Sequence, residues 1–325
     1  MPDFAHSRLR RRSLLFAGLA ALASRGASAS GYPTKPITLI LPFPPGGQSD
    51  VQMRILAQVA SKELGQPIVV LNRPGAGGTL GPALMAQTAQ PDGYTIALVV
   101  ATLFRQPALT KVNFDPAKDF TYLINLTGFA TGIVVKQDAP WKTLQDLLAD
   151  AKARPGAISF GSTGIGSGGH IAMARLLRDT GLQMTFVPFK GGAETTAALL
   201  GGHLDVIADP GWGPMVQAGK ARVLASMSQA RLQRFPQVPT LKELGYDLVV
   251  DSPIGLAGPK GMKPAVVQRL HDAFRHAMGN ADFARSLELN DQMPVYMGHE
   301  EYSRYAVTQT AREKAFIREL GITLD

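Results

Sequence analysis

The sequence predicts an α/β protein built on mostly parallel, doubly wound sheets, and three observations support this class. Short apolar runs typical of buried strands alternate with stretches whose apolar residues recur at helical spacing. A glycine- or proline-rich loop commonly separates a run from the helical stretch after it, an order typical of parallel β–α units. The 325 residues are 45% hydrophobic and 18% charged, which is ordinary for one large or two medium globular domains.

Residues 1–29 have the organisation of an export signal. Four arginines between residues 8 and 12 precede a short apolar run at 14–23, and Ala27-Ser28-Ala29 is a cleavage site of the A-x-A type. The run is too short to span a bilayer, and no later apolar window reaches the ~18 residues that a span needs. The stretch RRSLLF loosely resembles a twin-arginine signal, so both this route and the Sec route stay open.

Charge and cysteine content limit the possible functions. Cleavage after Ala29 leaves 28 basic and 24 acidic side chains, a net charge of +4 in place of the +8 of the whole chain. Much of the basic charge therefore belongs to the signal and does not argue for a nucleic-acid partner. The chain contains no cysteine, so an exported protein of this sequence has neither disulfides nor thiol chemistry.

The first part of the mature chain contains three predicted strands, each followed by a loop. Residues 36–43 (PITLILPF) form a strand that ends at PPGG, and Ser49 and Asp50 are predicted to cap a helix that ends at Gly65. PIVVLN is the second strand, followed by RPGAGG and a helical stretch to about residue 89. The turn PDG precedes the third strand, YTIALVV.

A second set of units begins near Thr131. GIVVK is a strand, Thr143 caps the helix LQDLLADAKA, and AISF leads through a glycine loop into the helix IAMARLLR. MTFVPF, AETTAALL and DVIAD are predicted as strand, helix and strand. Thr240 and Glu243 form a capping box, and the tail from Pro264 is predicted to hold two amphipathic helices.

One internal similarity bears on domain organisation. LILPFPPGGQSD and TFVPFKGGAETT share a strand, Pro-Phe and Gly-Gly before a helix. Two similar units that face each other would make a two-lobed protein, and chance similarity between two β–α units is the alternative.

The glycine-rich loops predict an anion site. Each lies between a strand and a helix, where open α/β sheets bind ligands. Glycine exposes consecutive backbone N–H groups, and the following helix adds the positive end of its dipole. Such a site needs no cationic side chain.

The loop GIGSGG at 164–169 matches the GxGxxG pattern of dinucleotide sites, but its surroundings do not fit NAD. The full fingerprint needs an acidic residue about 20 positions on, at the end of the next strand, and that strand ends in Pro188-Phe189-Lys190. The chain contains no GK[ST], GxSxG or HExxH motif. We therefore expect no enzyme activity, cofactor or metal, with an exported NAD-dependent oxidoreductase as the alternative.

The mature chain resembles the Bug-type solute receptors, which are the substrate-binding proteins of tripartite tricarboxylate transporters. The matching stretches run in order over most of residues 32–260: YPTKPITLILPFPPGGQSD, VVLNRPGAGG, PDGYT, RPGAISFGSTGIGSGGH, VPFKGGAETTAALLGGHLDV and VPTLKELG. The resemblance implies a type II periplasmic-binding-protein fold, in which two doubly wound lobes are joined by a hinge and enclose a ligand cleft. It places lobe one at about 31–129 plus 254–325 and lobe two at about 130–253.

The resemblance also implies a function and partners. We expect a periplasmic, monomeric receptor for a small carboxylate, which serves a membrane transporter of the tripartite type or a sensor protein. Carried over onto this sequence, the ligand-binding residues of lobe one are Phe43, Pro44, Pro45, Gly46, Gly47, Gln48, Asp50, Asn72, Gly75, Ala76, Gly77, Gly78 and Thr102. Those of lobe two are Ser162, Thr163, Gly164, Ser167, His170, Lys190, Gly191 and Asp209.

Two departures from the family pattern concern which ligand fits. Phe189 stands where the family often has Tyr, and the stretch ADPGWGP at 208–214 has no close match. Several of the expected contacts have a second interpretation: core packing for Phe43, Phe189 and Trp212, a helix cap for His170 and Asp50, a turn for Asp209, and solvated surface for Lys190.

Overall fold

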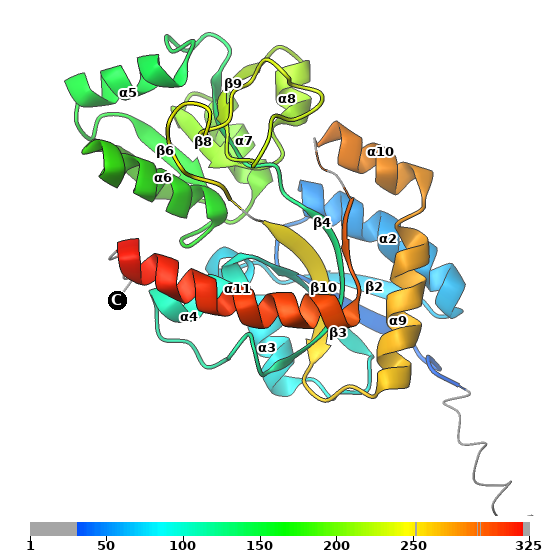
Figure 1. Ribbon diagram of the computed structural model, residues 1–325. Helices are drawn as coiled ribbons and strands as arrows, with labels where there is room; N and C mark the ends of the chain where they lie inside the picture. The colour runs from blue at the N-terminus through cyan, green and yellow to red at the C-terminus, as the bar shows by residue number, and fades with distance from the viewer. Residues whose placement is uncertain (1–30, 251, 291, 293, 321–325) are drawn as a thin grey trace, which may run out of the picture. The chain divides into compact units, whose positions relative to one another are not determined.

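Two mixed β-sheets with their surrounding helices form the fold of residues 35–320 (Figure 1). The structure is a computed structural model that describes residues 31–250, 252–290, 292 and 294–320. The predicted export signal, residues 1–29, lies outside the described residues. The chain divides into two units between residues 34 and 35, and the sheets and the cavity all belong to the second unit.

The first sheet has the strand order β11-β4-β10-β3-β1-β2. Strands β1, β2 and β3 are parallel, whereas β10 is antiparallel to both of its neighbours, β3 and β4. Its strands are β1 (Ile37–Leu41), β2 (Ile68–Asn72), β3 (Thr95–Val100), β4 (Phe120–Gly128), β10 (Pro253–Pro259) and β11 (Pro294–Met297). The chain segments of this sheet carry α2 (Gln48–Leu64), the 3-10 turn η2 (Ala76–Gly78), α3 (Leu80–Thr88), α4 (Thr102–Leu109), α9 (Pro264–Ala277), α10 (Ala281–Leu289) and α11 (His299–Leu320).

The second sheet has the strand order β7-β6-β8-β5-β9. Strand β6 is parallel to β7 and β8, and β5 is antiparallel to β8 and β9. Its strands are β5 (Gly132–Lys136), β6 (Ser159–Ser162), β7 (Thr185–Pro188), β8 (Val206–Asp209) and β9 (Ala221–Ser226). Its helices are α5 (Leu144–Ala153), α6 (Gly168–Thr180), α7 (Gly192–Leu200) and α8 (Gly213–Gln217).

Both sheets have the same topology. In each, three parallel strands are followed by an antiparallel strand and then by one more strand, and the first sheet adds β11 at its edge. The antiparallel strand is the one by which the chain arrives from the other sheet, since β5 follows β4 and β10 follows β9. The predicted α/β class with two doubly wound halves is confirmed. The sheets are mixed and not mostly parallel, because no local β–α connection sets the direction of β5 and β10.

Three helix caps were predicted, and the structure confirms one of them in full. Helix α2 begins at Gln48 with Gly47 as its N-cap, so Ser49 and Asp50 lie in its first turn and do not cap it. Thr143 caps α5 through a full capping box, as predicted. Thr240 and Glu243 make both hydrogen bonds of a capping box, yet residues 241–245 form a turn and not a regular helix.

The tail prediction was wrong in number, because α9, α10 and α11 are three helices, with β11 between the last two. None of the helices that the structure describes combines the length and the apolar character needed to cross a membrane.

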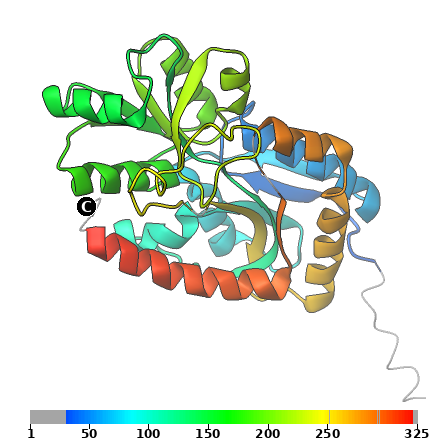
Figure 2. The same ribbon diagram turned by 45° about the horizontal axis from the view of Figure 1, so that its top comes forward.

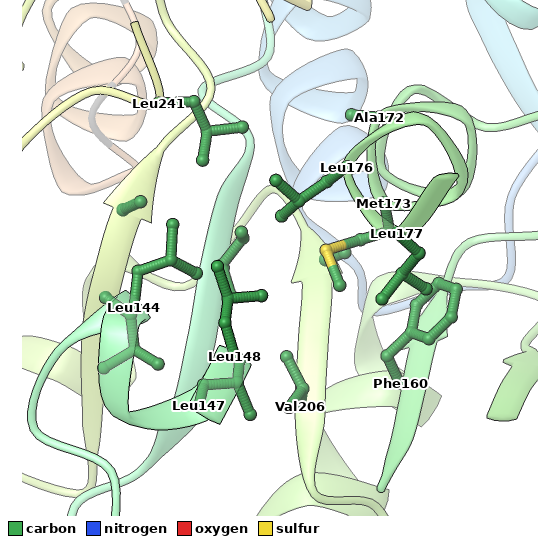
Figure 3. Packing of buried hydrophobic residues seen from close by; sticks show 14 of the residues in the cluster. Leu144, Leu147, Leu148, Phe160, Ala172, Met173, Leu176, Leu177, Val206 and Leu241 are labelled. Atoms are coloured by element: carbon green, nitrogen blue, oxygen red, sulfur yellow. The ribbon is translucent and has the colours of Figure 1, made fainter. Parts of the chain in front are cut away.

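Leucine-rich packing fixes the second sheet under its helices. Leu147 and Leu148 of α5 and Leu176 of α6 pack around Val206 and Phe160 on the sheet (Figure 3). Full burial of such a side chain contributes about 1.5–3 kcal/mol. The helices are therefore held firmly on the sheet, and the loops at the carboxyl ends of its parallel strands have a rigid base.

Candidate functional site

A cavity of about 510 Å³ lies where the carboxyl ends of the parallel strands of both sheets meet. The first sheet contributes the β1–α2 and β3–α4 loops and Gly77 of the turn after β2, and the second contributes the loops after β6, β7 and β8. Segments that connect the two sheets add Phe129, Thr131 and Ser252. The end of α10, which lies beside α2 in both views of the fold, closes one side (Figure 2).

Four helices begin in the cavity wall. The first residues of α2, α4, α6 and α7 are Gln48, Thr102, Gly168 and Gly192, and all four line the cavity. The first N–H groups of a helix have no acceptor within the helix, and the positive end of the helix dipole lies there. The wall thus offers backbone donors to an anion from both sheets.

The polar side chains of the wall are largely neutral. Hydroxyl groups come from both sheets, and the Gln48 side chain comes from the first residue of α2. The Gln48 Nε2 atom is buried and has no hydrogen-bond partner among the described residues. Neither a lysine, an arginine nor a histidine belongs to the part of the wall that the structure describes. An anion here is therefore bound by N–H and O–H groups and not by a side-chain cation.

Asp209 is the one charged side chain in the described part of the wall. It ends strand β8 and is 2% exposed. It accepts hydrogen bonds from the hydroxyls of Thr163, Thr195 (3.2 Å) and Ser162 (3.4 Å). Burial raises the pKa of Asp209 to about 6, although the hydrogen bonds from Thr163, Thr195 and Ser162 oppose the shift. Near neutral pH the group is mostly ionised and has only neutral partners.

A second buried acid, Asp50, holds the loops of the first sheet. It accepts hydrogen bonds from the Gly46 N–H (3.0 Å), from Asn72 Nδ2 (2.9 Å) and from two nitrogens of Arg54. Burial alone would raise the pKa of Asp50, but the bonds from Arg54, Asn72 and Gly46 outweigh it and keep this pKa below its usual range. Asn72 also donates to the Phe43 carbonyl (2.9 Å). Asp50 therefore shapes the β1–α2 loop from behind the cavity.

The loops of the two sheets contact each other across the cavity. A Cβ atom built on Gly164 would lie 2.7 Å from the Cα atom of Gly77, and one built on Gly191 would lie 2.8 Å from Cδ of Pro44. Only glycine permits these approaches. Gly77 has φ +60° and Gly164 has φ +82°, the left-handed region in which glycine is favoured. The backbones of the two groups of loops are therefore in direct contact.

The structure brings about half of the expected ligand-binding residues to the cavity wall. The lining residues among them are Phe43, Pro44, Gly46, Gly47, Gln48, Gly77, Thr102, Thr163, Ser167, Gly191 and Asp209. The others lie behind the wall or outside it: Pro45, Asp50, Asn72, Gly75, Ala76, Gly78, Ser162, Gly164, His170 and Lys190. Several of these support the wall, as Asp50 and Asn72 do. Lys190 is exposed.

Three residues with two interpretations have structural roles outside the wall. Trp212 is 1% exposed, packs on Phe235 and donates from Nε1 to the Ala130 carbonyl (3.0 Å). Phe189 packs against the same core cluster. His170 stacks on Phe186 and accepts the Gly166 N–H at Nδ1 (3.2 Å).

The pKa of His170 agrees with a structural role for its ring. Burial, together with the nearby Arg105 guanidinium, lowers the pKa of His170 to about 4, so the ring is neutral and shapes the glycine loop.

Sequence reasoning missed the part of the wall that comes from the tail and from the segments that connect the two sheets. Ser286, Leu289 and Asn290 at the end of α10 line the cavity, as do Phe129 and Ser252. No glycine motif marks these positions. The one signal in the sequence was the amphipathic pattern of the tail, which predicts helices that pack on the rest of the molecule. Because α10 packs beside α2, its last residues reach the same cavity.

Comparisons with known proteins agree with this geometry. The family model described as "Tripartite tricarboxylate transporter family receptor" matches residues 52–322. The chain is 46% identical over 306 residues to the "UPF0065 protein in gbd 5'region" of Cupriavidus necator, covering 94% of this chain and 93% of the relative. It is 32% identical over 303 residues to protein BugT of Bordetella pertussis, covering 91% and 93%.

Solved structures give the same result. The periplasmic binding protein BugD has a TM-score of 0.85 at 28% identity, covering 90% of this chain and 99% of BugD. MatC from Rhodopseudomonas palustris with bound malate has a TM-score of 0.81 at 25% identity, over 88% and 100%. Another R. palustris protein, solved with adipate, has a TM-score of 0.83 at 27% identity, over 90% and 100%. The matched family and these neighbours are solute-binding receptors and not enzymes, so the oxidoreductase alternative has no support.

Proposed function

Because this chain belongs to the tripartite tricarboxylate transporter receptor family, we propose that it binds a small organic carboxylate in the periplasm and delivers it to a membrane transporter of the tripartite type. The observation that carries the proposal is the cavity at the carboxyl ends of both sheets. Its helix N-termini, its hydroxyls and the unpartnered Gln48 amide suit a carboxylate bound without a side-chain cation. The malate and adipate of two structural neighbours support the same ligand class.

The two sheets act as lobes in this proposal. Lobe one comprises about 31–129 plus 254–325, and lobe two about 130–253. The ligand binds between them and favours closure only through contacts that it makes to both lobes at once. The contact of Gly77 with Gly164 supports this mechanism, since it joins the lobes beside the cavity.

A thermal-shift screen tests ligand binding. Residues 30–325 are purified, unfolded and refolded to remove a co-purified solute, and then heated with aliphatic, hydroxy-, amino- and aromatic carboxylates. A ligand at about 100 times its Kd adds about 2.7 kcal/mol of stability, or several degrees in Tm for a protein of this size. NAD(H) belongs in the panel. A shift with NAD(H) and none with a carboxylate would contradict the proposal.

Delivery to a transporter needs a separate test, because ligand binding alone does not distinguish a receptor that serves a transporter from one that serves a sensor protein. The tagged, ligand-loaded protein is used to capture partners from membranes of its source organism. Recovery of the integral subunits of a tripartite transporter supports delivery, and recovery of a sensor protein alone contradicts it. The protein acts as a monomer in this proposal, which light scattering checks.

A further inference from the structure

The half of the cavity wall that comes from the first sheet and the half that comes from the second differ in charge, although five strands of the first sheet repeat the topology of the second. Each half contains a buried acid close to the helix N-termini. Asp50 of the first half forms an ion pair with Arg54 (2.9 Å) and does not line the cavity. Asp209 of the second half lines the cavity, and its hydrogen-bond partners are the neutral hydroxyls of Ser162, Thr163 and Thr195.

The position of Asp209 determines what the second half can bind. Thr195 lies in the first turn of α7, and Ser162 contacts Ser167, the N-cap of α6, at 2.6 Å. Asp209 is thus linked to the N-termini of both helices. Its carboxylate is placed where the positive helix ends would otherwise favour a bound anion. The second half therefore presents an acceptor to the cavity, whereas the first half presents donors.

We infer that Asp209 makes the receptor selective for solutes with a single ionised carboxylate. The inference rests on the proposed function and narrows its ligand class. The carboxylate binds the donors of the first half, at the N-terminus of α2 and at Gln48. The far end of the solute lies near Asp209 and is neutral or carries a donor such as a hydroxyl, an amide or an ammonium group.

A second ionised carboxylate is disfavoured for two reasons. It loses its hydration on entering a wall that offers it no cation, and it lies close to the like charge of Asp209 in a water-excluded site. The remaining wall is rich in apolar side chains, among them Phe43, Phe129 and Leu289. This apolar part of the wall suits the uncharged body of a monocarboxylate.

Matched pairs of solutes test the inference by calorimetry at pH 8. Adipate and malate are each compared with their own monoamide, in which one carboxylate is replaced by a carboxamide of nearly the same size. We expect the wild-type protein to bind each monoamide at least tenfold more tightly than its diacid, which is about 1.4 kcal/mol. Asp209→Asn should reduce this ratio severalfold, because it removes the like charge and leaves only the cost of lost hydration. Asp205→Asn, which removes the same charge directly before β8, is the control and should leave the ratio unchanged.

The outcomes separate this inference from the proposed function. Equal or tighter binding of the diacids by the wild-type protein overturns the inference and leaves the carboxylate receptor standing; Lys190 would then be the first residue to examine as a cation. A monoamide preference that Asp209→Asn leaves unchanged also overturns the inference and leaves the carboxylate receptor standing. The wild-type comparison decides even where Asp209→Asn does not fold. Absence of binding by the diacids, the monoamides and the acids of the wider panel overturns both.

Discussion

The contact between Gly77 and Gly164 allows a direct test of closure. Replacing Gly164 by alanine adds one methyl group at the point where the loops of the two sheets meet. In the closed arrangement that carbon would lie 2.7 Å from the Cα atom and 3.0 Å from the backbone nitrogen of Gly77. Both are backbone atoms, so no side chain can move aside to make room.

The size of the effect follows from this distance. The optimum separation of two carbon atoms is about 3.5–4.0 Å, so the loops of Gly164→Ala have to separate by roughly 1 Å. Overpacking of this kind costs about 1–3 kcal/mol. The cost falls on the closed arrangement alone, because separated lobes leave the methyl group in open space. We therefore expect ligand affinity to fall by about 5- to 150-fold, with the lobes themselves intact.

A matched control removes the contribution of backbone strain. Gly164 has φ +82°, where alanine costs roughly 1–2 kcal/mol in the folded state. Gly202 has φ +73° in the same half of the molecule, and a Cβ atom built there meets no atom within 4 Å. Gly202→Ala should lose the same stability in urea denaturation and keep wild-type affinity in calorimetry. Equal affinities of Gly164→Ala and Gly202→Ala would falsify the view that ligand binding requires this contact.

Three further predictions concern the site and its support. Gly77→Asp should abolish binding with an unchanged circular dichroism spectrum, because its Cβ would meet the Ile165 carbonyl at 2.9 Å and its charge would face the bound carboxylate; an unaltered calorimetric Kd contradicts this. The pKa of about 6 for Asp209 lies above that of an unfolded aspartate, so this group stabilises the fold below pH 4 and loses roughly 3 kcal/mol of that contribution by pH 7. Asp209→Asn should therefore gain stability relative to wild type as the pH of urea denaturation rises, and a constant difference counts against the shift. Arg105→Met leaves the buried Glu313 unpaired and should cost about 3–5 kcal/mol, against about 1 kcal/mol or less for the exposed Arg154→Met; equal losses in the two variants exclude a buried ion pair of this strength.

Sequence patterns predicted the units of the fold better than their assembly. The strand and helix of a β–α unit are local, so β1, β2, β3 and the helices α2, α5, α6 and α7 were all predicted close to their observed places. Strand β10 was not predicted, because PIGLAGP carries two prolines and two glycines and lacks the usual strand pattern. Its place between β3 and β4 depends on contacts with residues more than 100 positions away.

In the candidate site too, local features were predicted and tertiary contacts were not. The glycine loops were predicted, since a loop before a helix N-terminus is a local feature. The sequence did not predict which residues of each loop line the cavity. Gly77 lines it, whereas its neighbours Ala76 and Gly78 do not. Leu289 and Asn290 of α10 reach the wall only because that helix packs beside α2. Such contributions follow from tertiary packing and leave no motif.

The internal similarity between LILPFPPGGQSD and TFVPFKGGAETT also has an explanation in the closed arrangement. The two strands are β1, which lies inside its sheet, and β7, which lies at the edge of the other. The strand of the second sheet that matches β1 in topology is β6, so the similarity does not reflect equivalent places in the two sheets. What the two stretches share is the cavity, where Pro44 of one loop contacts Gly191 of the other. Both loops must turn sharply, expose N–H groups and bring their backbones together, and these common demands favour the same Pro-Phe and Gly-Gly sequence before a helix.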